Sequence, residues 1–133
     1  MAELVCRLDR RLFDVRVGAH RIGGALHGRL DAAGIPVTHF PISTLKSPAA
    51  FRQMLRFASW CRELELQVVQ ACDFYANVFA LPGAALAGVP VRLGARRDVF
   101  MPERTRGQQR LQRLAYQLAH RVLANSSAAG ERW

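Results

Sequence analysis

Two short apolar runs constrain the fold most, because each one stops abruptly in a group of polar residues. The first run ends at Ala71 and leads into Asp73 to Asn77, and the second ends near Gly94 and leads into Arg96 to Asp98. An apolar run without alternation is typical of a strand that is buried on both faces of a parallel sheet. Open parallel sheets bind ligands at the carboxyl ends of their strands. The two polar groups are therefore the first candidates for a functional site.

Strand and helix patterns alternate along the whole chain. Periodicity, caps and breakers predict helices over about 2–9, 25–33, 48–63, 76–88 and 102–120, and strands over 13–17, 35–40, 68–71, 90–94 and 121–124. Pro82-Gly83 predicts a break or kink in the fourth helix. This alternation predicts an α/β domain with a mostly parallel sheet, and 133 residues suit one domain that spans the chain.

Two of the predicted helices carry apolar stripes at helical spacing. The stripes consist of Phe51, Met54, Leu55, Ala58 and Cys61 in the third helix, and of Leu111, Leu114, Ala115, Leu118 and Ala119 in the fifth. Each stripe predicts an amphipathic helix with its charged residues on the opposite face.

The chain is strongly basic, with nineteen basic residues against ten acidic ones and a net charge of +9. All of the basic residues except Lys46 are arginines, and they are densest at Arg104, Arg106, Arg110 and Arg113. Such an excess steers a protein toward phosphate, nucleic acid or an anionic membrane surface. The alternative is that the guanidinium groups simply cover helix faces. Tyr116 is the only aromatic residue of the basic helix, which weakens the case for single-stranded nucleic acid.

Cysteine usage and hydropathy favour a cytoplasmic protein. Cys6, Cys61 and Cys72 are an odd set with long spacings, which suits neither a disulfide framework nor a zinc site. No apolar run approaches the length of a membrane span, and charged residues interrupt the N-terminus where a signal peptide would be apolar. The four histidines show no metal-ligand spacing, so we expect no metal site.

The candidate sites each have a plain structural alternative. Asp73 to Asn77 lies where a strand hands over to a helix N-terminus, which suits a polar or anionic ligand, but Asp73 as a simple helix cap explains it equally well. Arg96 and Arg97 could grip phosphate or carboxylate with Asp98 orienting them, or form an exposed salt-bridged loop. Asn125-Ser126 is most simply a capping pair.

Six segments in this order and spacing resemble the N-terminal domain of family 4 GT-B glycosyltransferases. They are Leu8 to Val15, Ala32 to Val37, Asp73 to Asn77, Ala84 to Val91, Arg96 to Asp98 and Leu118 to Ser126. Each segment alone is weakly specific, whereas together they cover essentially the whole chain.

The resemblance implies a Rossmann-like, doubly wound sheet that forms the acceptor side of a retaining glycosyltransferase. It implies a nucleotide-sugar donor, held mainly by a second domain, and a saccharide or lipid-linked acceptor; no further cofactor is expected and no catalytic residue is assigned. The residues that it places in the cleft are Asp73, Phe74, Tyr75, Asn77, Arg96, Arg97 and Asn125. We expect a cytoplasmic location, with peripheral contact at the inner membrane face through the Arg-rich helix.

This sequence departs from the family pattern in two ways. Members often carry His where this chain has Gln70 and Cys72. Members also begin with a strand ahead of Ala2 and continue into a donor domain, so we expect this chain to be a fragment that is inactive alone. In a sheet of order 3-2-1-4-5-6 the first strand is central, so its loss would expose strand edges and leave the chain marginally stable or prone to associate.

Two other function classes remain open at this point. A stand-alone α/β binding or regulatory module is one, for instance a phospho-receiver, because Asp73 follows a strand; receivers also need an acidic pair and a late Lys, and the only Lys is Lys46. A basic nucleic-acid-binding domain is the other, supported by the +9 charge alone.

Overall fold

The computed structural model describes residues 2–96 and 105–124. The chain divides into two compact units, Met1–Ser43 and Thr44–Trp133. Over the described ranges helices and strands alternate, and every strand pair is parallel. The predicted α/β class with parallel strands is therefore confirmed, and the single domain over 1–133 stays a prediction.

The first unit is a parallel strand pair with two helices. It contains α1 (Ala2–Arg7), β1 (Val17–Ala19), α2 (Ala25–Ala32) and β2 (Val37–His39), with Val17 opposite Val37. Its core consists of Val15, Leu30 and Ile35, with Val5, Leu8, Val17 and Val37 packed around them. Gly34 ends α2 at φ 63, a conformation that favours glycine.

The first strand starts later than its alternating pattern predicted. The amides of Leu12 and Phe13 both donate to the carbonyl of Asp9, so the chain turns here. Phe13 is 50% exposed, while Val15 packs in the core without joining the ladder. The alternation from Phe13 to Val17 thus marks the approach to β1, and pairing begins only at Val17.

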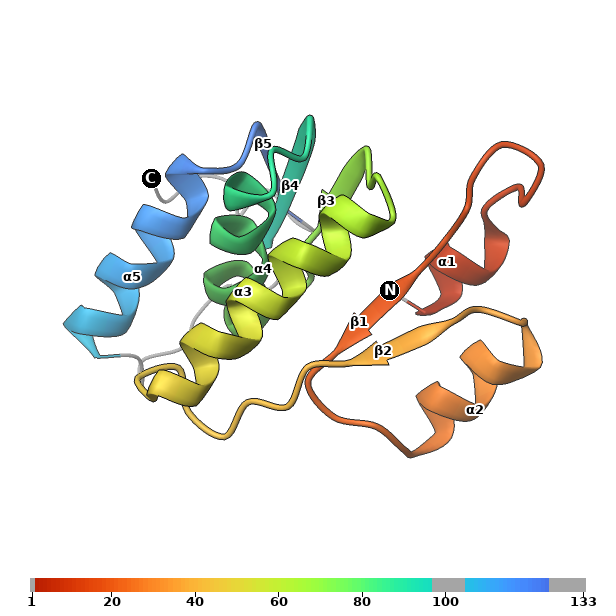
Figure 1. Ribbon diagram of the computed structural model, residues 1–133, viewed down its shortest axis with the longest axis horizontal. Coiled ribbons are helices and arrows are strands. Elements are labelled where there is room, and N and C mark those ends of the chain that lie inside the picture. The colour runs from red at the N-terminus through yellow and green to blue at the C-terminus, as the bar shows by residue number, and fades with distance from the viewer. Residues whose placement is uncertain (1, 97–104, 125–133) are drawn as a thin grey trace. The chain divides into compact units, whose positions relative to one another are not determined.

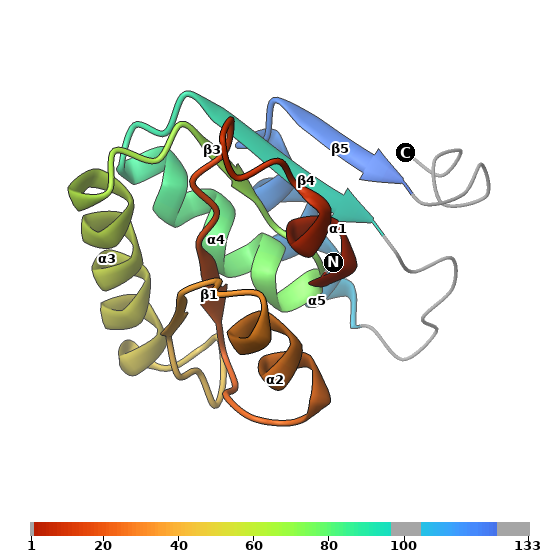
Figure 2. The same cartoon turned by 90° about the vertical axis from the view of Figure 1, so that its right-hand side faces the viewer.

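The second unit is a three-stranded parallel sheet with three helices. Its elements are α3 (Pro48–Glu63), β3 (Val68–Gln70), α4 (Phe74–Leu86), β4 (Val91–Arg96), α5 (Arg106–Gln117) and β5 (Arg121–Ala124). The strand order is β3-β4-β5. Helix α4 packs on β3 and β4, with α3 on one side of it and α5 on the other (Figure 1). Figure 2 shows the strands of this sheet above α4.

Side-chain caps fix where the helices of this unit begin. The Ser47 hydroxyl accepts from the Ala50 amide at 3.1 Å, and Thr105 and Gln108 form a capping box at the start of α5. Both are the residue types that satisfy otherwise unpaired amides in the first turn. Pro48 at the first helical position adds a residue that has no amide to satisfy.

Helix α4 continues through Pro82, so the helix does not break at Pro82-Gly83, and the alternative of a kink there stays a prediction. Gly83 instead allows a close helix contact, because a Cβ added there would lie 2.7 Å from a ring carbon of Phe57 on α3. The rings of Phe57 and Phe79 pack at 5.4 Å beside it. Tight packing of α3 on α4 holds the helix together where one backbone hydrogen bond is lost.

The two apolar stripes are only partly buried. On α3, Ala58 and Cys61 are buried, whereas Phe51 is 57% exposed and Leu55 is 43% exposed. On α5 the buried residues are Ala115 and Tyr116, whereas Leu111, Leu114 and the C-cap residue Leu118 are exposed. Helical spacing therefore identified the helices correctly but not the face that each one turns to the core.

None of the helices in the described part of the chain is long and apolar enough to cross a bilayer.

Burial makes a testable difference between two cysteines. Cys61 is 1% exposed, and burial raises the pKa of its thiol to about 12, with Arg62 offsetting part of the rise. At pH 8 this leaves on the order of 10⁴-fold less thiolate than thiol, and only the thiolate reacts. Cys6 is exposed. We expect iodoacetamide to label Cys6 in the native protein and Cys61 only after unfolding, as read by peptide mass spectrometry. Equal labelling rates at the two cysteines in the native chain would contradict this packing.

Candidate functional site at the carboxyl edge of the sheet

The register of β3 and β4 brings two predicted site residues to the same edge. Gln70 pairs with Leu93, so Asp73 and Arg96 each follow three residues later in neighbouring parallel strands. Arg96 also pairs with Ala124 of β5. Arg97 and Asn125, which the sequence also assigned to the cleft, lie outside the described residues. Within the described residues, Asp73 and Arg96 thus lie at the same carboxyl edge, and contact with a ligand stays a prediction.

Asp73 is the N-cap of α4. Its Oδ1 accepts from the Ala76 amide at 2.9 Å, and its carbonyl accepts from the Asn77 amide at 2.8 Å. A carboxylate here also faces the positive end of the helix dipole. The capping interpretation of Asp73 is therefore correct, and its exposed side chain still leaves the carboxylate at the surface of this edge.

Phe74 and Tyr75 divide between core and surface. Phe74 is 5% exposed and belongs to the core, whereas Tyr75 is 55% exposed. Their rings meet edge to face, with centroids 5.3 Å apart and planes at 79°. Tyr75 is thus a surface aromatic held against a buried ring, an arrangement that presents a fixed apolar face beside Asp73.

Asn77 has no exposed surface and holds α4 to β4. Its Nδ2 donates to the Ala95 carbonyl at 2.8 Å, and its Oδ1 accepts from the Ala95 amide at 3.2 Å. Both backbone groups of Ala95 are thereby satisfied by one side chain. A place for Asn77 in a cleft stays a prediction. In the structure Asn77 fixes the start of α4 to the end of β4.

Tyr116 and Gln112 complete this buried polar group, and sequence reasoning missed both. The Tyr116 hydroxyl lies 3.4 Å from Asn77 Nδ2 and donates to the Ala95 carbonyl at 3.4 Å. Gln112 Nε2 donates to the Tyr116 hydroxyl at 2.6 Å. A Cβ at Gly94 would lie 3.2 Å from the Tyr116 ring. The available signal was a Gln and a Tyr four residues apart on one helix face, opposite a glycine in a strand.

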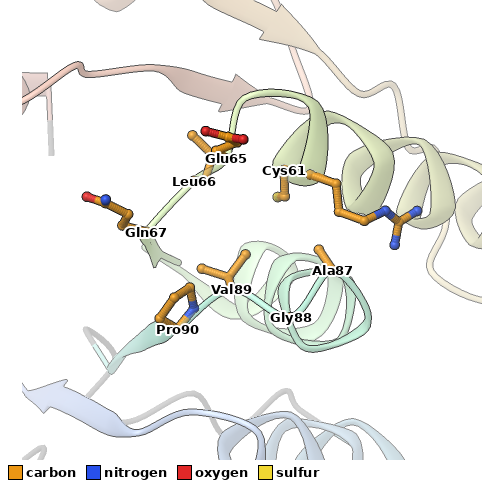
Figure 3. A pocket seen from close by; sticks show the side chains of 9 residues that line it. Cys61, Glu65, Leu66, Gln67, Ala87, Gly88, Val89 and Pro90 are labelled. Carbon is orange, nitrogen blue, oxygen red and sulfur yellow. The ribbon is translucent and has the colours of Figure 1, made fainter.

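A hollow of about 250 Å³ lies at the amino ends of β3 and β4, opposite the carboxyl edge that carries Asp73 and Arg96. It is lined by the segments that follow α3 and α4 and enter β3 and β4, including Glu65, Gln67 and Pro90 (Figure 3). Cys61 also lines it, but its raised pKa makes this thiol a poor nucleophile. The hollow is therefore separate from the predicted site.

Metal-ligand residues do not gather in the part of the chain that the structure describes: no three His, Cys, Asp or Glu side chains come together there. His20 and His39 instead donate to backbone carbonyls of Phe40 and His20, at 3.1 and 3.2 Å.

Removing the amide of Asn77 should destabilise the domain more than removing the cap at Asp73. Asn77→Ala leaves the buried amide of Ala95 unpaired and its carbonyl with only the long bond from the Tyr116 hydroxyl, so we expect a loss of roughly 2–4 kcal/mol in the free energy of unfolding. Asp73→Ala removes an exposed cap and should cost about 1 kcal/mol. Urea denaturation followed by circular dichroism measures both. Equal effects of the two substitutions would mean that the buried amide does not hold α4 to β4.

Comparison with known proteins identifies the family of the chain that forms this edge. The model of the family described as "Glycosyl transferase 4-like domain" matches residues 1–132. Searches of curated proteins and of solved structures gave no match. The resemblance that the six segments indicated is therefore confirmed, and membership of this family supports a glycosyltransferase role in general, which implies nucleotide-sugar and acceptor substrates. This chain belongs to the glycosyl transferase 4-like domain family.

Proposed function

We propose that this chain is the acceptor-binding half of a retaining glycosyltransferase. The observation that supports the proposal best is the shared carboxyl edge, where Asp73 follows β3 and Arg96 ends the neighbouring parallel strand β4 in a chain of this family. Ligands of open parallel sheets bind at this edge. The acceptor is a saccharide or a lipid-linked saccharide, and the enzyme works on the cytoplasmic side of the membrane.

The polar and aromatic groups of the edge, with Asp73 and Tyr75 exposed and Arg96 half-buried, suit an acceptor with hydroxyls and an anionic group. The Asp73 carboxylate can accept hydrogen bonds from sugar hydroxyls, and the exposed ring of Tyr75 offers an apolar face to a sugar ring. Arg96 supplies a guanidinium that can bind phosphate or carboxylate through two parallel hydrogen bonds. Together they would bind and orient the acceptor, and Asn77 would act as a positioning residue beneath them.

Transfer needs the donor sugar to be held against the acceptor. Correct placement of two reactants contributes up to about 7–11 kcal/mol to lowering a barrier, so an acceptor site without a donor site forfeits most of the rate. We therefore expect no measurable transfer by these 133 residues alone. Adding a nucleotide-sugar-binding domain of the same family, in one chain or in trans, should restore it.

Substitutions at the edge should weaken sugar binding without unfolding the chain. We expect Tyr75→Ala and Arg96→Gln each to reduce affinity about fivefold to tenfold, which corresponds to roughly 1–1.4 kcal/mol. Saturation-transfer NMR with methyl glucoside, methyl mannoside, N-acetylglucosamine and glucose 1-phosphate measures this. Arg96→Gln should act most on the phosphorylated sugar.

Arg52→Gln, on an exposed position of α3, is the control for the loss of one positive charge in Arg96→Gln. Equal losses from these two variants would reduce the effect to net charge. Binding that is unchanged in both Tyr75→Ala and Arg96→Gln would remove the acceptor site from this edge.

We further propose that α5 contacts an anionic membrane surface, which would bring a lipid-linked acceptor to the domain. Arg106, Arg110 and Arg113 are exposed, and the spacing of Leu111, Leu114 and Leu118 sets a second exposed stripe beside them. A helix with adjacent basic and apolar stripes can bind phosphates while its leucines enter the interface.

Vesicle binding tests the two stripes separately. Arg110→Gln/Arg113→Gln should weaken binding to phosphatidylglycerol vesicles by roughly 30-fold, from about 1 kcal/mol per basic residue. Leu114→Gln should weaken it in a way that added salt does not mimic. The control is Leu86→Gln, because Leu86 on α4 is 57% exposed and Leu114 is 58% exposed. Equal binding to phosphatidylcholine, or tighter retention on duplex DNA than on vesicles, would contradict the membrane proposal.

A further inference from the structure

The end of β4 is held by α5 as well as by α4. The Ala95 carbonyl accepts from Asn77 Nδ2 at 2.8 Å and from the Tyr116 hydroxyl at 3.4 Å. Gln112, one turn earlier on α5, donates from Nε2 to that hydroxyl at 2.6 Å. Two helices therefore meet at one backbone carbonyl, and the next residue along the strand is Arg96.

The Tyr116 hydroxyl makes its hydrogen bonds inside the protein. A hydroxyl has one hydrogen to donate and two lone pairs that accept. The hydrogen goes to the Ala95 carbonyl, while Gln112 Nε2 and Asn77 Nδ2 lie 2.6 and 3.4 Å from the oxygen. Tyr116 is 7% exposed. Its hydroxyl is therefore placed to hold the strand rather than to contact a ligand.

The ring of Tyr116 packs on the residue before Ala95. A Cβ added at Gly94 would lie 3.2 Å from one ring carbon and 3.3 Å from another. The ring thus approaches the strand backbone closely where the strand has no side chain. Through its ring and its hydroxyl, Tyr116 contacts the two residues that come directly before Arg96.

This support lies where the pairing of β3 with β4 has stopped. The two strands pair only as far as Leu93. Beyond it, on the side of β3, the Ala95 backbone bonds to the side chains of Asn77 and Tyr116. Helix α5 thus supplies part of the support that a neighbouring strand gives elsewhere in the sheet.

A fixed strand end matters for an arginine that binds phosphate. Two parallel hydrogen bonds to phosphate require the planar guanidinium to lie at a defined place and angle. A binding group that is not preorganised loses more conformational freedom on binding. Asp73 and Tyr75 differ from Arg96, because α4 carries them and Asn77 fixes the start of α4. Movement of the strand end would therefore weaken phosphate binding more than binding of a neutral sugar.

We propose that Tyr116, supported by Gln112, is a positioning residue that makes the edge select phosphorylated over neutral saccharide acceptors. It acts through Arg96 and touches no ligand. The inference rests on the proposed function, in which Arg96 binds the anionic group of the acceptor. It adds that this selectivity depends on a buried hydroxyl of α5 as well as on the arginine.

Removal of one hydroxyl tests the inference in the full chain. Tyr116→Phe keeps the ring on Gly94 and removes the bond to the Ala95 carbonyl. We expect the affinity for glucose 1-phosphate to fall about threefold to fivefold, less than in Arg96→Gln because the guanidinium is kept. The affinity for methyl glucoside should stay unchanged. Saturation-transfer NMR measures both, and a general loss of structure would lower both alike.

Gln112→Met is a second variant, in case Tyr116→Phe lowers the melting temperature. It removes the donor to the Tyr116 hydroxyl and keeps the tyrosine, so the affinity for glucose 1-phosphate alone should fall about twofold. Gln117→Met is the matched control, because Gln117 is an exposed residue of the same helix. It should bind both sugars as the unchanged protein does.

A double variant shows whether Tyr116 acts through Arg96. Tyr116→Phe/Arg96→Gln should bind glucose 1-phosphate no more weakly than Arg96→Gln alone, since the residue that Tyr116 positions is gone. Additive losses would mean that the two residues act independently, which would overturn the inference.

The outcomes separate this inference from the proposed function. Unchanged binding of glucose 1-phosphate in Arg96→Gln would remove the anion site from this arginine, and the inference would fall with it. A loss in Arg96→Gln with none in Tyr116→Phe and Gln112→Met would leave the proposed function standing and overturn the inference alone. Equal losses for both sugars in these two variants would reduce Tyr116 to a structural residue and also overturn it.

Discussion

The contact of Asn77 with Ala95 is the constraint on which the carboxyl edge depends. β3 leaves the sheet after Gln70, while β4 continues to Arg96. The amide and carbonyl of Ala95 therefore point to a place that no strand occupies, and the Asn77 side chain supplies one acceptor and one donor there. A side-chain amide thus replaces the last rung of a strand ladder. Because Asn77 lies in the first turn of α4, the same contact fixes where Asp73 and Tyr75 sit relative to β4.

The parts of the fold that were predictable are those set by local chemistry. Ser47 and Asp73 begin helices because their oxygens satisfy first-turn amides, and Gly34 ends one because it adopts positive φ. The parallel arrangement followed from strands that alternate with helices. These features depend on neighbours in sequence, so the sequence shows them directly.

The parts that could not be predicted depend on neighbours in space. The stripes on α3 and α5 have the right spacing, yet Phe51 and Leu114 are exposed because no described element of the second unit covers them. Asn77 was predicted as a cleft residue together with Asp73, and it is buried in the structure. Its hydrogen-bond partners, Ala95 and Tyr116, are distant in sequence, so the sequence alone does not show them. Of the predicted site, Asp73 and Arg96 share the edge, and contact with a ligand stays a prediction.

The missing side chain at Gly83 has a consequence for how this domain can change over evolutionary time. Helix α3 approaches α4 so closely there that the Phe57 ring occupies the volume that a methyl group would need. The two positions therefore share one volume, which the Phe57 ring fills because Gly83 has no side chain. A substitution at either position is acceptable only if the other changes in the opposite sense. Descendants of this sequence should vary at these two sites together, however freely the surface arginines around them are exchanged.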